Sequence, residues 1–202
     1  MSASVLLLRH PPVTRAWRKR CYGRSDMGWS RAGTAMAHAL VDQLAAHPID
    51  AIVHSGALRT HRLAEMIARA RAIPVHADAG WLERDFGTWE GRTWHAIWRE
   101  TGDLMDRMMT DPAGFRPGGG ETGQDLSERA QAAWERLPTS GTTLVVAHGG
   151  PIAALRAWQA GAPLEAMVHH IPACGAVIAV SREPAPRPTA PAGAVTERPA
   201  RP

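Results

Sequence analysis

The chain has 202 residues, of which 45% are hydrophobic and 21% are charged. These proportions are ordinary for a globular domain with a full core, and they exclude collagen-like and wholly disordered chains. No apolar run approaches the roughly 20 residues that a membrane-spanning helix needs. The apolar run at residues 5–8 is too short for a signal peptide, because Arg9 and His10 follow it at once. We therefore expect a cytoplasmic protein without a membrane partner.

The charge balance does not indicate a nucleic-acid partner. The net charge is +4, yet the longest basic tract is residues 18–20, whereas nucleic-acid-binding proteins cluster their basic residues on one face. The two cysteines, Cys21 and Cys174, are too few and too far apart in the sequence for a disulfide framework or a Cys-rich zinc site. We expect neither a metal ion nor a cofactor.

A change in composition divides the chain into a domain and a tail. Residues 182–202 contain six prolines and four arginines but almost no large apolar side chain. Such a segment cannot bury enough apolar surface to offset the entropy lost on ordering. We expect one domain at residues 1–181 and a disordered tail at residues 182–202.

Within the domain, short apolar runs alternate with patterns of helical period. The predicted strands are residues 5–9, 51–53, 74–76, 143–147 and 176–180. The predicted helices follow Ser30 as far as Pro48 and then cover residues 58–71, 93–109, 125–137 and 151–160. This alternation is typical of an α/β fold, namely a three-layer α/β/α sandwich with a mainly parallel sheet.

Polar residues follow three of the predicted strands. Arg9 and His10 end the first, and His148 and Gly149 come directly after the strand at 143–147. Arg59 lies in the first turn of the helix that follows the second strand. In such sheets, ligands bind beyond the carboxyl ends of the strands. Helix N-termini favour anions there, and arginine donates paired hydrogen bonds to phosphate. The pattern predicts a phosphate pocket.

Four motifs resemble one known family. They are VLLLRH at 5–10, SGALRTHRLAEMIA at 55–68, LERDFGTWEG at 82–91 and LVVAHGGPIAAL at 144–155. In this order they resemble the histidine phosphatase superfamily, which has the phosphoglycerate-mutase-like fold, and the resemblance covers about residues 4–180. Each motif alone is weak, whereas the four together are specific.

The resemblance implies a role for each matching residue. His10 would be the nucleophile that accepts the phosphoryl group, and Glu83 would be the proton donor. The phosphate ligands would be Arg9, Arg59, His148 and Gly149. Asp85 and Glu90 are rival candidates for the proton donor, because they lie two and seven residues further on.

The chain also departs from the family pattern. Ala16 stands where most members have an asparagine that binds phosphate. Arg15, Tyr22 or Arg24 could replace that ligand. His54, His169 and His170 could be metal ligands or surface residues; two adjacent histidines on a helix point in different directions and chelate poorly, which favours the surface.

The sequences RHPPV and CYGRSD at 9–13 and 21–26 are most similar to the α-ribazole phosphatase branch. The resemblance implies a metal-independent phosphomonoesterase that acts on a small phosphate ester, α-ribazole 5′-phosphate, in cobalamin nucleotide-loop assembly. Alternatives are a phosphatase of broad specificity for sugar and organic phosphates, a phosphoglycerate mutase, a phosphohistidine protein phosphatase, and a catalytically silent protein that binds phosphate or a partner. We expect residues 93–125 to form a lid that sets the substrate.

Overall fold

A five-stranded sheet forms the centre of the molecule. The computed structural model describes residues 3–69 and 71–182. β1 (Ser4–Arg9) lies between β4 (Thr142–Ala147), its parallel neighbour, and β5 (Val177–Ser181), which is antiparallel. β2 (Ala51–His54) pairs in parallel with β4 and with the short edge strand β3 (Val75–Ala77). The order β3-β2-β4-β1-β5 confirms the expected mainly parallel sheet.

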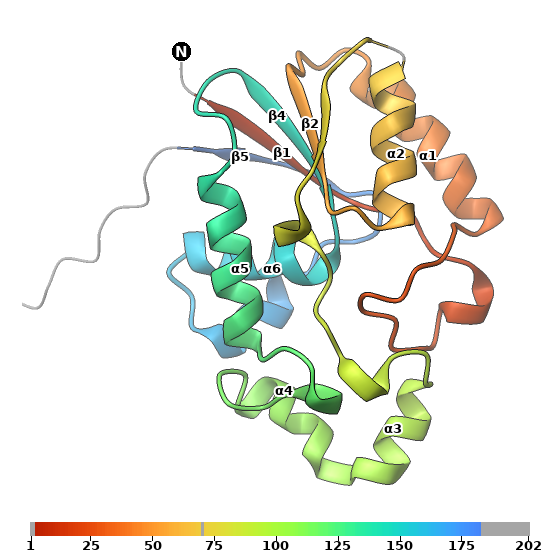
Figure 1. Cartoon of the computed structure of the whole chain (residues 1–202), viewed down its shortest axis with the longest axis vertical. Coiled ribbons are helices and arrows are strands. Elements are labelled where there is room, and N and C mark those ends of the chain that lie inside the picture. Colours follow the sequence, from red (N-terminus) through yellow and green to blue (C-terminus); the bar gives the residue numbers. More distant parts are fainter. Residues whose placement is uncertain (1–2, 70, 183–202) are drawn as a thin grey trace, which may run out of the picture.

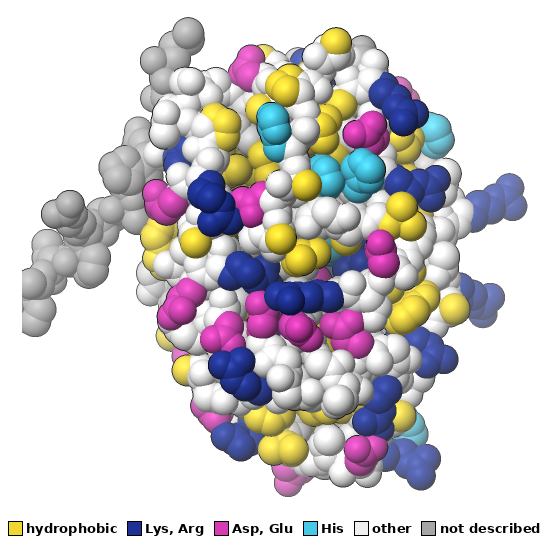
Figure 2. All heavy atoms as spheres, viewed as in Figure 1, with side chains coloured by type: hydrophobic (Ala, Val, Ile, Leu, Met, Phe, Trp, Pro, Cys, Tyr) yellow, Lys and Arg dark blue, Asp and Glu magenta, His cyan; other side chains and the backbone are white. Residues whose placement is uncertain are grey.

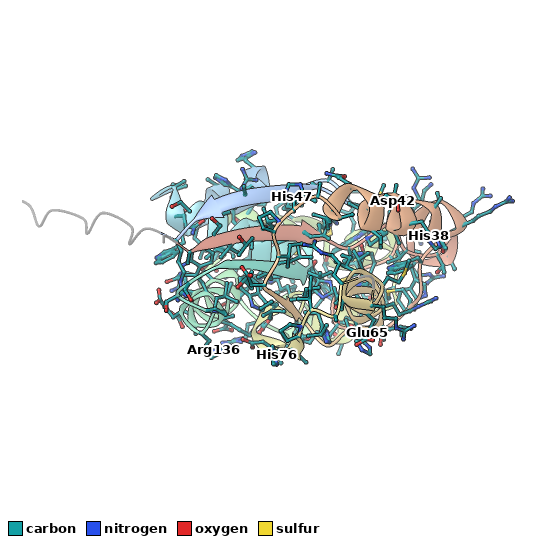
Figure 3. The ribbon with its side chains drawn as sticks, turned by 90° about the horizontal axis from the view of Figure 1, so that it is seen from above. His38, Asp42, His47, Glu65, His76 and Arg136 are labelled. Atoms are coloured by element: carbon teal, nitrogen blue, oxygen red, sulfur yellow. The ribbon has the colours of Figure 1, made fainter. Side chains whose placement is uncertain are left out.

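Helices cover both faces of this sheet (Figure 1). α1 (Arg31–Leu44) and α2 (Leu58–Arg69) pack on one face, and α5 (Gly123–Glu135) and α6 (Gly149–Gln159) pack on the other. In Figure 3, His38 and Asp42 mark α1, Glu65 marks α2, and Arg136 marks the end of α5. The three-layer α/β/α architecture expected from the alternation of elements is confirmed.

The apolar run of β1 is continuous because both of its faces are buried. Leu6 and Leu8 pack with α1 and α2, whereas Val5 and Leu7 pack with α5 and α6. Successive side chains of a strand point to opposite faces, so a strand between two helix layers needs apolar residues at every position. This packing brings the carboxyl ends of β1, β2 and β4 to one edge.

Two helices begin earlier than the sequence pattern predicts. α5 starts at Gly123, where the Thr122 side chain accepts from the Asp125 backbone and Asp125 accepts from Thr122 in return, forming a capping box. α6 starts at Gly149, two residues before Pro151, and His148 is its N-cap. Because α6 starts so early, His148 is the single residue between the end of β4 and the first turn of α6.

The prediction of one helix over residues 93–109 is wrong. α3 (Trp94–Thr101) ends at Gly102, whose φ of 52° is left-handed. A 3₁₀ turn (Gly102–Asp106) and the short α4 (Arg107–Thr110) follow. Glycine adopts this conformation without strain and loses the most entropy inside a helix, so the chain turns there. The helical spacing of apolar residues continues past Gly102, so the sequence pattern did not indicate that the helix ends there.

The segment that contains α3 and α4 has an apolar cluster of its own. Ile97 and Phe115 pack with Cys21 and Trp89, and the segment lies at one end of the molecule (Figure 1). Further 3₁₀ turns are Arg15–Trp17, Ala79–Trp81, Gly87–Trp89, Pro117–Gly119 and Leu164–His170. Apart from Arg182, the expected tail lies outside the described residues. No helix in the described part is both long and apolar enough to cross a membrane.

Candidate active site

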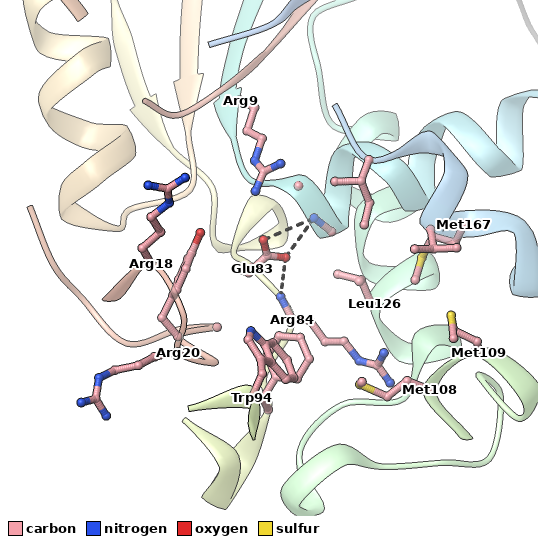
Figure 4. A pocket seen from close by; sticks show the side chains of 17 residues that line it. Arg9, Arg18, Arg20, Glu83, Arg84, Trp94, Met108, Met109, Leu126 and Met167 are labelled. Atoms are coloured by element: carbon pink, nitrogen blue, oxygen red, sulfur yellow. Dashed lines mark hydrogen bonds between the residues drawn. The ribbon is translucent and has the colours of Figure 1, made fainter. Parts of the chain in front are cut away.

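A cavity of about 550 Å³ opens beside the ends of β1 and β4 (Figure 4). Its polar side chains are Arg9, Arg18, Arg20, Tyr22, Glu83 and Arg84. Its apolar side chains are Phe86, Trp94, Met108, Met109, Leu126, Met167, Val168 and Ile171. The polar and apolar groups therefore meet in one pocket, to which both the sheet edge and the α3–α4 segment contribute.

His10 lies directly after β1 and is fully buried. Its Nδ1 is 2.7 Å from the carbonyl oxygen of Pro11. A carbonyl only accepts, so Nδ1 carries the proton and Nε2 keeps a free electron pair. Burial, together with the positive charge of Arg59, lowers the pKa of His10 from 6.5 to about 3. His10 is therefore a neutral imidazole whose Nε2 has an electron pair that can attack an electrophile.

His148 faces His10, with their ring centroids 5.2 Å apart. Its Nε2 lies 2.7 Å from the Ser55 hydroxyl, which is 2.8 Å from the Thr60 hydroxyl. Thr60 donates its only hydroxyl proton to the carbonyl of Ala57, so Ser55 must donate to Thr60. Ser55 is then the acceptor for His148 Nε2–H, and Nδ1 remains free. Burial and the charge of Arg59 hold the pKa of His148 well below its usual range.

Arg59 is fixed by a loop on the other side of the site. It lies in the first turn of α2 and is fully buried. Its Nη2 donates to the carbonyl of Gly23 at 2.7 Å, and its Nη1 donates to that of Ser25 at 2.9 Å. The Tyr22 ring lies against the guanidinium, 5.4 Å from Cζ to centroid. Both terminal nitrogens are thus engaged, and Nε is left without a partner.

Arg9 ends β1 and lies against the start of α6. Its Nη1 donates to the carbonyl of Pro172 at 2.6 Å. A Cβ at Gly149 would come within 3.1 Å of Arg9 Cζ. Glycine at this position therefore allows the guanidinium to approach the helix N-terminus, where unpaired backbone N–H groups favour an anion.

Buried polar atoms without a partner are concentrated in this site. Five such side-chain atoms occur among the described residues, and four of them belong to it: Arg9 Nε, His10 Nε2, Arg59 Nε and His148 Nδ1. Each unpaired buried group costs about 1–3 kcal/mol, so a protein retains such groups where a ligand pairs with them. Two guanidiniums and two imidazoles suit a phosphate.

Only one of the three candidate acids faces the cavity. Glu83 lines it and accepts hydrogen bonds from the backbone N–H of Gly150 and Arg84, both at 3.0 Å (Figure 4). Asp85 instead accepts from the Gly87 backbone at 2.8 Å, and Glu90 accepts from the loop at residues 24–25. The geometry therefore favours Glu83 over Asp85 and Glu90 as the proton donor.

The three residues considered in place of the missing asparagine lie in different environments. Tyr22 lines the cavity, whereas Arg15 is exposed and does not line it. Arg24 pairs with Glu121 at 2.8 Å and with Asp85 at 3.5 Å. Figure 2 shows basic and acidic side chains gathered together across this face of the molecule. Arg24 is thus engaged with carboxylates outside the pocket.

Sequence reasoning missed Arg18, Arg20 and Arg84 as lining residues of the cavity. The first two belong to the short basic tract at residues 18–20. This tract lies close in the sequence to Ala16, where the family asparagine is missing, and that proximity was the available signal for a basic residue in the pocket. Arg84 is buried, donates from Nε to the backbone carbonyl of Glu121 at 3.0 Å and lies over the Phe86 ring. Its place next to Glu83 in the motif gave no indication of that orientation.

The other candidate histidines, His54, His169 and His170, do not line the cavity. His54 accepts from the backbone N–H of Gly56 at 3.0 Å and stacks on His61. His169 is exposed and His170 is half-buried, both on the 3₁₀ turn at 164–170. The part of the chain that the structure describes contains no group of three or more His, Cys, Asp or Glu side chains arranged to hold a metal ion.

Solved structures with the same fold include Bacillus stearothermophilus YhfR, with a TM-score of 0.79 and 27% identity over 88% of this chain and 90% of that one. Another is a proposed alpha-ribazole-5′-P phosphatase of Escherichia coli, with a TM-score of 0.81 and 25% identity over 90% of this chain and 91% of that one. Mycobacterial glucosyl-3-phosphoglycerate phosphatase, at 23% identity and a TM-score of 0.77 over 90% of this chain and 91% of that one, shares the fold.

Proteins related by sequence also match most of this chain. "Bifunctional protein Rv2228c" of Mycobacterium tuberculosis is 33% identical over 152 residues, which are 73% of this chain and 42% of the relative. The chain thus spans less than half the length of that protein. "Probable phosphoglycerate mutase GpmB" of Salmonella choleraesuis is 29% identical over 79% of this chain and 75% of the relative. The family model of the histidine phosphatase superfamily (branch 1) matches residues 5–187. With nearly the whole described chain matched, the protein belongs to the histidine phosphatase superfamily.

Proposed function

We propose that this protein is a phosphomonoesterase that passes the phosphoryl group of a small organic phosphate first to His10 and then to water. The observation that carries the proposal is the presence of four unpartnered buried nitrogens, on Arg9, His10, Arg59 and His148. Arg9 lines the cavity, and the other three lie directly behind its lining residues: His148 precedes Gly149, His10 faces His148, and Arg59 binds the carbonyl of Gly23. Arg9 and Arg59 offer N–H donors to an anion, His148 offers one when it is protonated, and neutral His10 offers an electron pair. A phosphate monoester matches both requirements.

In the first step, Nε2 of His10 attacks phosphorus and the bond from phosphorus to the ester oxygen breaks. The N–H groups at Nε of Arg9 and Arg59 donate to the non-bridging oxygens, where charge is spread in the transition state. The carboxylic acid of Glu83 gives its proton to the departing oxygen. The products are phosphohistidine, the free alcohol and the Glu83 carboxylate.

In the second step, Glu83 takes a proton from a water molecule while the water oxygen attacks phosphorus. The bond between phosphorus and Nε2 of His10 breaks, and its electron pair returns to the imidazole. Inorganic phosphate leaves, and Glu83 is protonated again. The same carboxyl group therefore acts as acid and then as base, and no oxidant or further reactant is required.

His148 has a separate part in binding. Its neutral form presents a bare electron pair at Nδ1, because Nε2–H is directed at Ser55. A phosphate oxygen beside that atom needs a proton between them, so we infer that His148 binds phosphate as an imidazolium. The proton arrives with the monoanionic form of the ester or from solvent, and the phosphate charge then stabilises it.

For the substrate, we propose α-ribazole 5′-phosphate. Trp94, Phe86, Met108 and Met167 give the cavity an apolar wall that suits a flat aromatic ring. The structural similarity to the Escherichia coli protein, named for that substrate, supports the same choice. The α3–α4 segment supplies Trp94, Met108 and Met109, and we propose that it acts as the lid that selects the leaving group.

A broader phosphatase is the second candidate. Arg18, Arg20 and Arg84 also line the cavity, and guanidiniums there can donate to the hydroxyl or carboxylate groups of sugar and organic phosphates. Such contacts are polar, and they would favour a leaving group other than an apolar ring. The two candidates therefore differ in which wall of the cavity contacts the substrate.

Two measurements test the proposal. Rapid acid-free quenching and mass spectrometry should find phosphate on His10 in the wild-type protein and none in His10→Ala, which should also lose nearly all turnover. His169→Ala, at an exposed histidine, is the control and should retain activity. Phosphate found on another side chain, or turnover by His10→Ala, would contradict the mechanism. An absence of any turnover or phosphoenzyme would favour the silent binding protein.

The second measurement is a panel of kcat/KM values. It compares α-ribazole 5′-phosphate with sugar phosphates, 3-phosphoglycerate and an aryl phosphate. A clear preference for α-ribazole 5′-phosphate supports the first substrate. Equal turnover of several unrelated esters would replace it with the broad phosphatase, and transfer of phosphate between phosphoglycerates would indicate a mutase.

A further inference from the structure

Glu90 lies outside the cavity, and its carboxylate accepts four hydrogen bonds. Oε1 accepts from the backbone N–H of Arg24 at 2.8 Å and of Phe86 at 3.3 Å. Oε2 accepts from the backbone N–H of Ser25 at 2.7 Å and from its hydroxyl at 2.6 Å. No arginine, lysine or histidine in the described part of the chain forms an ion pair with it. Its charge is therefore balanced by neutral N–H and O–H donors, three of which belong to the loop at residues 24–25.

That loop also holds Arg59. The peptide unit between Gly23 and Arg24 donates its N–H to Glu90, and its carbonyl accepts from Arg59 Nη2 at 2.7 Å. The two groups of a trans peptide point in opposite directions, so one peptide unit bridges the carboxylate and the guanidinium. Hydrogen bonds that share a peptide in this way polarise and strengthen one another.

Gly23 makes this bridge sterically possible. Its φ is +33°, and a Cβ there would lie 2.3 Å from Glu90 Oε1 and 2.6 Å from the carbonyl oxygen of Arg84. A larger residue would displace either the carboxylate or the loop. The close approach of Glu90 to the loop backbone thus depends on glycine at this one position.

We propose that Glu90 is a positioning residue that sets the orientation of Arg59 through the loop at residues 23–25. Both terminal nitrogens of Arg59 bind carbonyls of this loop, so the position of the loop determines where Nε points. Glu90 holds the loop from the opposite side. This inference rests on the proposed function, because Arg59 Nε is the donor to the phosphoryl group in that mechanism.

The test compares Glu90→Gln with Asp85→Asn. Either orientation of the introduced amide places its NH₂ against a backbone N–H, since both oxygens of Glu90 accept from one. Asp85→Asn is the matched control, because the amide oxygen can still accept from Gly87. We expect Glu90→Gln to lower kcat/KM about 10- to 100-fold, the scale of a small misplacement of a catalytic group. Inhibition by inorganic phosphate should weaken in parallel, and Asp85→Asn should change neither by more than about 2-fold.

A double-mutant cycle separates positioning from general loss of structure. In an Arg59→Ala background, Glu90→Gln should change the inhibition constant of inorganic phosphate by less than about 2-fold. The turnover of an activated aryl phosphate should change equally little. A full cost in both backgrounds would show that Glu90 does not act through Arg59 and would overturn the proposal. Thermal unfolding of each variant establishes that it is folded.

Ser25→Ala provides a milder variant should Glu90→Gln fail to fold. It removes one hydrogen bond to Oε2 and should give a smaller loss with the same dependence on Arg59. An equal loss with and without Arg59 would again overturn the inference. Failure of the proposed function is a different result, because the wild-type protein would then form no phosphohistidine. Failure of the inference would occur in an active enzyme.

Discussion

Nε2 of His148 lies 2.7 Å from the hydroxyl oxygen of Ser55, and this contact determines which nitrogen of the ring is free. The hydroxyl proton of Ser55 is already directed to Thr60, so Ser55 accepts from His148. Ser55 thereby leaves Nδ1 of His148 without a partner, and this is the atom that we propose as a phosphate ligand.

Ser55→Ala should therefore weaken phosphate binding while His10 remains intact. The variant leaves Nε2–H of His148 buried without an acceptor, and the loss of one such bond costs about 1–3 kcal/mol. We expect the inhibition constant of inorganic phosphate to rise by about tenfold or more. Ser25→Ala leaves the Ser55–His148 contact untouched. Any loss of phosphate affinity in Ser25→Ala should instead depend on the presence of Arg59. An unchanged inhibition constant in Ser55→Ala would show that phosphate binding does not depend on the contact between Ser55 and His148.

Leaving-group chemistry should identify Glu83 as the acid. An alkyl phosphate needs a proton on its departing oxygen, whereas a nitrophenyl phosphate leaves as a stable anion. General acid catalysis contributes about 10²–10⁴-fold, so Glu83→Gln should lose that much in alkyl phosphate turnover and far less in single-turnover phosphorylation by the aryl ester. Asp85→Asn should show no such dependence. Equal losses for both esters in Glu83→Gln would reduce Glu83 to a positioning role.

Stability should fall as the pH drops below 6.5. The pKa of His10 is about 3 in the folded protein, and burial also places that of His148 far below its usual range. Between these values and 6.5 the unfolded chain binds protons that the folded protein does not, so stability rises with pH there. The slope is about 1.4 kcal/mol per pH unit for each such histidine. Denaturant unfolding at pH 5 and pH 7 measures it.

The variant His10→Gln provides the comparison for that experiment. It removes one titrating group, so its loss of stability between pH 7 and pH 5 should be smaller than in the wild-type protein. Parallel stability curves for the two proteins would mean that His10 is not buried as a neutral group.

Activity should survive removal of divalent cations. In the proposed mechanism, Arg9 and Arg59 supply the charge that a metal ion would otherwise bring to the phosphoryl oxygens. The measurement is kcat/KM before and after dialysis against a strong chelator, and the two values should be the same. Loss of activity on chelation, followed by recovery with one particular metal, would contradict the arginine-based mechanism.

The fold class and the neighbourhood of the site could be predicted from the order of the residues alone. The patterns that predicted them are local in the sequence. Apolar strands are continuous because helices bury both faces of the sheet, and the polar residues that follow three strands lie near helix starts, whose N–H groups are unpaired. Arg9, His10, Arg59 and His148 could therefore be selected before any contact was known. Their convergence needed only the parallel order of β1, β2 and β4.

Which loop side chains face the cavity depends instead on contacts between distant parts of the chain. Glu83, Asp85 and Glu90 are three carboxylates in one motif, and before the structure only the family resemblance favoured Glu83. Contacts with Gly150, Gly87 and the loop at residues 24–25 place the three side chains in different positions. Contacts with distant residues also determine the positions of Arg18, Arg20 and Arg84, which the sequence alone does not distinguish from ordinary surface residues. A loop residue has no period that encodes its direction, because that direction is set by partners far along the chain.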